Sequence, residues 1–125
     1  MGRVLFIDDD VLALQLMSRV TSLLGYQALL SSEPDSALDL AAREKPGLIV
    51  VDMLMTEMDG TEFVSRLRQS PEISHLPVLI YSAGTGQKDE ERARSAGADG
   101  FLLKPVGLEE LSQVFRHYLG AASPA

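Results

Sequence analysis

Short apolar runs that stop at a polar residue alternate with helical patterns along the chain, and this alternation constrains the fold more than any other feature. Four of the runs are clear and one is weaker; they cover residues 4–7, 48–51, 78–81, 101–103 and, as the weaker case, 27–30. Runs of this kind are typical of strands that are buried on both faces of a parallel sheet. Apolar stripes at helical spacing lie between and after them, in residues 12–23, 37–42, 63–67, 91–96 and 108–119.

Five strand and helix pairs in strict alternation predict an α/β fold with right-handed crossovers and helices on both faces of the sheet. We expect a flavodoxin-like (βα)5 doubly wound parallel sheet with strand order 2-1-3-4-5. The chain has 125 residues, 46% of them hydrophobic, which suits one domain with one real core. We place this domain at residues 1–119 and interpret residues 120–125, which are small apart from one Pro, as a tail or the start of a linker.

Composition excludes several classes of protein. The formal net charge of −7 argues against the broad basic face that binding to a nucleic-acid backbone requires. The absence of cysteine excludes disulfides, thiolate zinc sites and cysteine nucleophiles, and suits a reducing cytoplasm. The first residues do not have the pattern of a signal peptide, and no stretch has the length of a membrane span. We therefore expect a cytoplasmic protein that binds neither nucleic acid nor membrane.

Three aspartates follow two of the predicted strands at the point where ligands bind in such sheets. Asp8 and Asp9 come after the first run and Asp52 after the run at 48–51. In the order 2-1-3-4-5 these strands are neighbours at the switch point, so the three carboxylates meet and repel one another unless a cation joins them. Oxygen ligands without Cys or His favour Mg²⁺. A simpler interpretation, that such an aspartate only caps the next helix, suits Asp10.

Two further polar side chains follow two of the remaining predicted strands. Lys104 follows the last run and Ser82 follows the run at 78–81. A carboxylate, a metal, an ammonium and a hydroxyl around one point are what an in-line displacement at phosphorus needs. In this arrangement Asp52 is the candidate nucleophile. Taken alone, Lys104 could be a solvated lysine and Ser82 a strand-end residue that bonds to backbone.

Together these residues resemble a known family. The resemblance rests on four motifs: Phe6-Ile7-Asp8-Asp9-Asp10, Asp52-Met53-Leu54-Met55-Thr56-Glu57-Met58-Asp59-Gly60, Ser82-Ala83 and Lys104-Pro105. From Val4 to about Leu119 the chain is similar to the receiver domains of bacterial two-component response regulators. As a set, the four motifs are highly specific.

The resemblance implies a role for each acidic residue of the pocket. Asp52 corresponds to the phosphoacceptor, Asp9 to a direct Mg²⁺ ligand and Asp8 to a ligand through water. The backbone carbonyl of Leu54 corresponds to a third protein ligand, and Mn²⁺ is expected to substitute for Mg²⁺. Lys104 corresponds to the lysine that contacts a phosphoryl oxygen.

The resemblance also implies a switch. In the family, a hydroxyl at the position of Ser82 moves onto the phosphoryl group, and an aromatic ring at the position of Phe101 turns inward. The peptide bond between Lys104 and Pro105 is expected to be cis. Thr56 stands where the family usually has Pro, so we expect the loop after Asp52 to be less rigid.

The resemblance implies a phosphoacceptor receiver domain rather than an enzyme that turns over an external substrate. A histidine kinase or phosphotransfer protein would donate the phosphoryl group, and an unidentified output partner or a fused effector domain would read the changed surface. Self-catalysed phosphotransfer and slow autodephosphorylation are the only chemistry expected. One alternative is a pseudo-receiver that binds partners without phosphorylation. A hydrolase of the haloacid dehalogenase type fits poorly, because its Asp-x-Asp-x-Thr pattern is absent after the first strand, where Asp10 precedes Val11 and Leu12.

Overall fold

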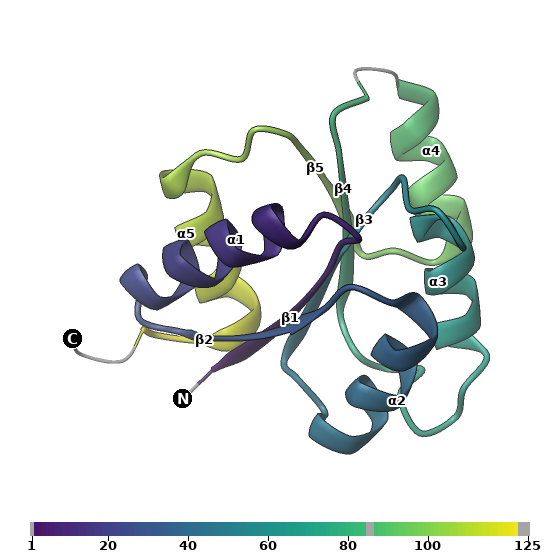
Figure 1. Ribbon diagram of the computed structural model, residues 1–125, viewed down its shortest axis with the longest axis horizontal. Helices are drawn as coiled ribbons and strands as arrows, with labels where there is room; N and C mark the ends of the chain where they lie inside the picture. The colour runs from purple at the N-terminus through teal and green to yellow at the C-terminus, as the bar shows by residue number, and fades with distance from the viewer. Residues whose placement is uncertain (1, 85–86, 123–125) are drawn as a thin grey trace.

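The computed structural model describes residues 2–84 and 87–122, in which strands and helices alternate (Figure 1). The strands are β1 (Arg3–Ile7), β2 (Gln27–Ser31), β3 (Leu48–Asp52), β4 (Val78–Ser82) and β5 (Gly100–Leu103). The helices are α1 (Val11–Leu23), α2 (Pro34–Glu44), α3 (Gly60–Arg68), α4 (Gln87–Ala96) and α5 (Leu108–Leu119). The predicted alternation of five strands with five helices is confirmed.

The five strands form one parallel sheet in the order β2-β1-β3-β4-β5, which confirms the predicted order. β1 and β3 are neighbours, and Ile7 lies opposite Val51. Asp8 follows β1 directly and Asp52 ends β3, so both carboxylates emerge at the same edge of the sheet. β3 is one residue longer than its apolar run because Asp52 remains paired with β4, opposite Tyr81.

Helices cover both faces of the sheet, with α1 and α5 on one side and α2, α3 and α4 on the other (Figure 1). Successive strand residues point to opposite faces, so Leu5 lies in the core under α2 to α4, whereas Val4 and Phe6 lie in the core under α1 and α5. Phe115 of α5 packs edge-on against Phe6, with ring centroids 6.3 Å apart. Burial on both faces makes the central strands a fixed platform for the side chains at their ends.

The ends of the helices follow local sequence signals. The Asp10 carboxylate accepts hydrogen bonds from the backbone N–H groups of Leu12 and Ala13, which confirms that Asp10 caps α1. Gly25 and Gly97 have φ angles of 90° and 109° just after α1 and α4, a conformation that glycine adopts at low cost.

The helices α2 and α4 are longer than their apolar stripes indicated. In α4, Ala93 is the only buried residue between Gln87 and Ala96, so periodicity marks only a small part of the helix. At the C-terminus, Gly120 follows α5 with φ 81°, and the last part of the predicted tail, residues 123–125, lies outside the described residues. Among the helices of the described ranges, none combines the length and apolar character needed to cross a membrane.

The N-cap of α3 is an aspartate that has both hydrogen-bond donors and an arginine as partners. Asp59 is the N-cap of α3 and accepts hydrogen bonds from the Glu62 N–H and the Thr61 hydroxyl. Arg92 of α4 lies 3.3 Å from the same carboxylate. Partial burial opposes ionisation of Asp59, but these hydrogen bonds and the charge of Arg92 outweigh it and lower the pKa of Asp59.

We predict that replacing Asp59 with Ala lowers the free energy of unfolding at pH 7 by about 1 kcal/mol, the usual cost of losing an N-cap. Asn retains the cap, so Asp59→Asn is the matched control and should lose much less.

Because the folded pKa of Asp59 lies below the unfolded value of about 3.9, its ionic contribution to stability is complete above that pH and disappears as the pH falls through the folded pKa. Urea unfolding at pH 7 and near pH 3 checks this; an equal loss in Asp59→Ala at both pH values would contradict it.

Candidate functional site

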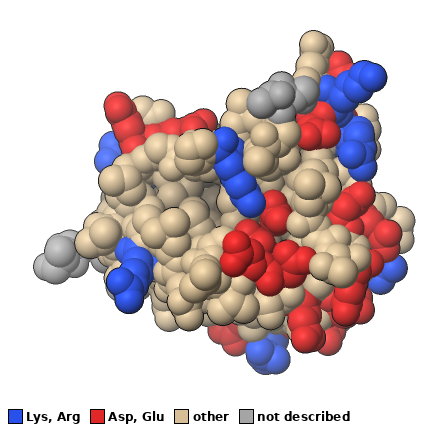
Figure 2. Space-filling model, turned by 45° about the horizontal axis from the view of Figure 1, so that its top comes forward, with Lys and Arg blue, Asp and Glu red and all other residues tan. Residues whose placement is uncertain are grey.

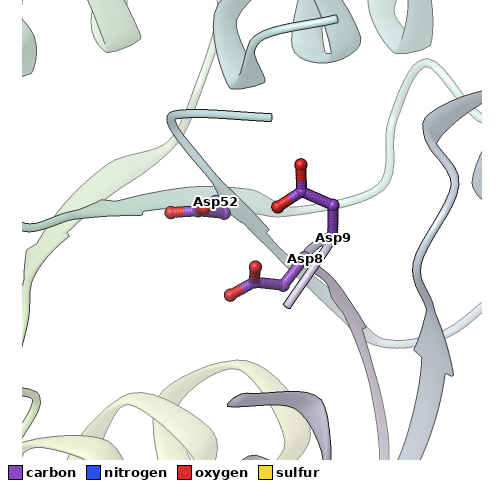
Figure 3. A group of neighbouring side chains, drawn as sticks. All are labelled: Asp8, Asp9 and Asp52. Atoms are coloured by element: carbon purple, nitrogen blue, oxygen red, sulfur yellow. The ribbon is translucent and has the colours of Figure 1, made fainter. Parts of the chain in front are cut away.

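The carboxylates of Asp8, Asp9 and Asp52 converge where β1 and β3 end (Figure 3). One oxygen of each lies within 4.8 Å of the other two. Asp8 and Asp52 are buried and Asp9 is exposed. Figure 2, which turns the carboxyl ends of the strands forward, shows acidic side chains gathered in the middle of this face with a basic side chain beside them. Carboxylates this close repel one another, so a positive charge is needed if all three are to remain ionised.

Lys104, the residue after β5, supplies one positive charge. Its Nζ lies 3.0 Å from Asp52 Oδ1 and 3.8 Å from Asp8 Oδ2. The same ammonium lies over the ring of Tyr81, 4.3 Å from the ring centroid. The peptide bond from Lys104 to Pro105 is cis. A single ammonium offsets only part of the charge of three carboxylates.

The surroundings of Asp52 oppose its ionisation. Its burial is the main cause of a raised pKa, and the charges of Asp8 and Asp9 add to the effect. The hydrogen bond and charge of Lys104 act in the opposite direction without cancelling it. The ionised form of Asp52 is therefore unfavourable in this pocket, and a further cation would stabilise it.

Asp8 is fixed through both of its oxygens. The backbone N–H of Asp10 donates to Oδ1 at 2.9 Å, and the buried Tyr81 hydroxyl donates to Oδ2 at 2.8 Å. Burial, together with the neighbouring Asp8 carboxylate, raises the pKa of Tyr81, so its hydroxyl stays protonated as the donor. The sequence analysis did not identify Tyr81. The available signal was a hydroxyl-bearing aromatic residue at the end of an otherwise aliphatic run, one residue before Ser82.

Asp9 is held by the loop that follows β3. Both the backbone N–H and the hydroxyl of Thr56 donate to Asp9 Oδ2, at 2.9 and 2.8 Å. The hydroxyl bond and then the backbone bond are the main causes that lower the pKa of Asp9. Thr56 was expected to leave this loop less rigid than a proline would. That expectation stays a prediction, but the structure shows that Thr56 donates two hydrogen bonds from this loop to Asp9, neither of which a proline can donate.

The two candidate switch residues lie at different depths. Ser82 ends β4 and is buried, and its hydroxyl accepts a hydrogen bond from the Gly84 N–H at 2.9 Å. Phe101 lies in β5 and is half-buried against the core under α2 to α4. Leu54, whose backbone carbonyl is a candidate metal ligand, has a side chain that is 75% exposed.

The donor set suits a hard divalent cation. All three converging side chains offer oxygen atoms, and neighbouring carboxylates of this kind are the ligands that Mg²⁺ accepts together with water and phosphate oxygens. Asp52 lies beside the other two acids and 3.0 Å from the Lys104 ammonium. The arrangement places its carboxylate next to one fixed cation and next to a site that fits a second.

Comparison with known proteins finds similar sequences and similar folds. Residues 4–116 match the family model of the response regulator receiver domain. The chain is 30% identical over 119 residues to the polar-differentiation response regulator DivK of Brucella anthropi, an alignment that covers 95% of this chain and 97% of that relative. The chemotaxis protein CheY4 of Vibrio cholerae shares 28% identity and a TM-score of 0.87, over 95% and 99% of the two chains. The receiver domain of the sensor histidine kinase PA1611 of Pseudomonas aeruginosa shares the fold at 23% identity, with a TM-score of 0.86 over 97% and 100% of the chains.

We predict that Asp52→Asn raises the free energy of unfolding when divalent cations are removed by a chelator. The substitution keeps the shape of the side chain but removes a buried charge that burial, Asp8 and Asp9 all disfavour. Asp35→Asn, at an exposed position on α2, removes one carboxylate elsewhere and is the control. Urea unfolding of the three proteins measures the effect, and an Asp52→Asn protein less stable than the unsubstituted chain would refute the prediction.

Proposed function

Because the chain belongs to the response regulator receiver domain family of two-component signalling, we propose that it is a phosphorylation-operated switch in which Asp52 is the phosphoacceptor. The donor is a histidine kinase or a phosphotransfer protein. The observation that carries the proposal is the position of Asp52, with Lys104 Nζ 3.0 Å from one oxygen and the carboxylates of Asp8 and Asp9 beside it.

The proposed chemistry is an in-line displacement at phosphorus. An oxygen of Asp52 forms a bond to phosphorus while the bond from phosphorus to the donor imidazole nitrogen breaks, and the imidazole leaves with that electron pair and takes up a proton. Lys104 then pairs with an oxygen of the transferred phosphoryl group. This group carries more negative charge than the Asp52 carboxylate with which Lys104 pairs before the transfer. The domain acts on itself in this step, so we propose an acceptor rather than an enzyme with an external substrate.

The residues present fit Mg²⁺ as the cofactor of this step. Asp8, Asp9 and Asp52 would hold it with the backbone carbonyl of Leu54, and Mn²⁺ suits the same oxygen donors. When bound, the ion supplies positive charge that offsets the repulsion among the carboxylates and the phosphoryl oxygens. The hydrogen bonds of Asp10 and Tyr81 to Asp8, and of Thr56 to Asp9, orient these ligands from outside.

The proposed output is a population shift. A phosphoryl group on Asp52 offers acceptor oxygens to the Ser82 hydroxyl, which otherwise accepts from the Gly84 N–H. Movement of Ser82 at the end of β4 changes the room available to side chains of the neighbouring strand β5. One of these is Phe101, which is only half-buried. Contacts made only in the phosphorylated state favour an arrangement with Phe101 further inside and a changed outer face for an output partner or a fused effector domain.

We expect that incubation with Mg²⁺ and a small acyl phosphate adds one phosphoryl mass to the intact chain, as measured by mass spectrometry. Asp52→Asn should abolish the adduct, whereas Asp35→Asn should retain it, because Asp35 is exposed and outside the pocket. Addition of a chelator should suppress the reaction in the unsubstituted chain. An adduct that persists in Asp52→Asn would contradict the assignment, and no adduct in any form would favour the pseudo-receiver alternative.

For the switch, we predict that Mg²⁺ with a beryllofluoride mimic of the phosphoryl group perturbs the backbone amide resonances of Ser82, Gly84 and Phe101. The physical reason is transfer of the Ser82 hydroxyl from its Gly84 contact to the mimic. The amides at the opposite end of the sheet, such as Gln27, serve as the internal control. Unchanged Phe101 resonances under conditions that shift Asp52 would contradict coupling between the site and β5.

A further inference from the structure

We infer that Tyr81 is a positioning residue of the phosphoacceptor site: its hydroxyl orients the Asp8 carboxylate toward the cation, and its ring holds the Lys104 ammonium beside Asp52. This inference rests on the proposed function, because it assigns a role at the same site. It concerns a side chain of β4 that touches two members of the site, Asp8 after β1 and Lys104 after β5.

The place of Tyr81 follows from strand register. In β4 it lies opposite Asp52 of β3 and opposite Leu102 of β5. Its ring belongs to the core under α1 and α5 and is 4% exposed, while the next residue, Ser82, points to the other face of the sheet. A phenylalanine ring would fill the same space in this core. Packing therefore accounts for the ring of Tyr81 but not for its hydroxyl.

The hydroxyl acts on Asp8. Asp8 is 1% exposed, and each of its oxygens has a donor: the Asp10 N–H for Oδ1 and the Tyr81 hydroxyl for Oδ2. A carboxylate has about four lone-pair sites, so two fixed donors set its rotation and leave other lone pairs for a cation. Without the hydroxyl, Oδ2 is free to turn toward the Lys104 ammonium, which lies only 3.8 Å away. That rotation would change which lone pairs Asp8 offers to a cation.

The ring acts on Lys104. The ammonium lies 4.3 Å from the Tyr81 ring centroid, on a side chain that is 30% exposed. Attraction between a cation and an aromatic face is stronger when the cation is partly removed from water. The ring thus holds the ammonium at a point within reach of Asp52 Oδ1, 3.0 Å away, where a transferred phosphoryl oxygen would need it. The two roles belong to different parts of one side chain, so two substitutions separate them.

The first test is Tyr81→Phe, which removes the hydroxyl and keeps the ring. Mg²⁺ binding, titrated by calorimetry, should be about tenfold weaker, the lower end of the effect of losing a group that orients a metal ligand. In phosphorylation by a small acyl phosphate, the Mg²⁺ concentration for half-maximal rate should rise by a similar factor, and saturating Mg²⁺ should recover most of the lost rate. Tyr81→Leu removes the ring as well and should leave a further loss of about threefold at saturating Mg²⁺.

Tyr26→Phe is the matched control. Tyr26 lies in the same core at 5% exposure, and its hydroxyl also donates a hydrogen bond, partly buried, to the Gly120 carbonyl oxygen. Loss of that hydroxyl tests the general effect of removing a phenol hydrogen bond away from the site. We expect the Mg²⁺ affinity of Tyr26→Phe to be unchanged.

The unsubstituted chain offers a measurement that does not depend on how the variants fold. Mg²⁺ should shift the ring resonances of Tyr81 and leave those of Tyr26 in place. An unshifted Tyr81 ring, or a folded Tyr81→Phe with unchanged Mg²⁺ affinity, would overturn the inference while leaving the proposed function intact. If the unsubstituted chain neither binds Mg²⁺ nor accepts a phosphoryl group, the proposed function itself fails. A selective loss of affinity in Tyr81→Phe supports the positioning role.

Discussion

The repulsion among three carboxylates at the carboxyl ends of β1 and β3 is the constraint on which the rest of the site depends. Asp8 and Asp52 are both buried, and within the described part of the chain the Lys104 ammonium is the only one that lies near both. Folding therefore leaves negative charge uncompensated, which costs stability in the absence of a divalent cation. The same uncompensated negative charge attracts a cation. The loss of stability and the capacity to bind a cation therefore have the same cause.

The carboxylates are alike in chemistry but not in surroundings. Asp8 is held through both oxygens, Asp9 is tied to the following loop by Thr56, and Asp52 has Lys104 as its main partner. The hydrogen bonds from Thr56 lower the pKa of Asp9, whereas burial raises the pKa of Asp52. Differences in hydrogen bonding and burial thus distinguish two carboxylates that are held by hydrogen-bond donors from a third whose ionisation is opposed by burial.

The sheet makes this arrangement possible because its central strands are immobilised from both sides. All five residues of β3 and of β4 are buried, and both end in a polar residue at the site, Asp52 and Ser82. The flanking parts are less constrained: Phe101 in β5 is half-buried, and α4 buries only Ala93 among its residues. The proposed switch has a physical basis in this contrast, because small shifts in the buried strands β3 and β4 can change how the loosely packed β5 and α4 are arranged.

The sequence by itself determined the α/β class, the strand order, the single-domain size and the meeting of Asp8, Asp9 and Asp52, because buried runs, helical stripes and strand-end residues are local patterns with few compatible topologies. It also indicated the cap at Asp10. Only the tertiary structure decided which donors hold those acids. The contacts of Tyr81 with Asp8 and of Thr56 with Asp9 span 73 and 47 residues of sequence. Contacts of this kind depend on strand register and side-chain direction, which no local pattern specifies.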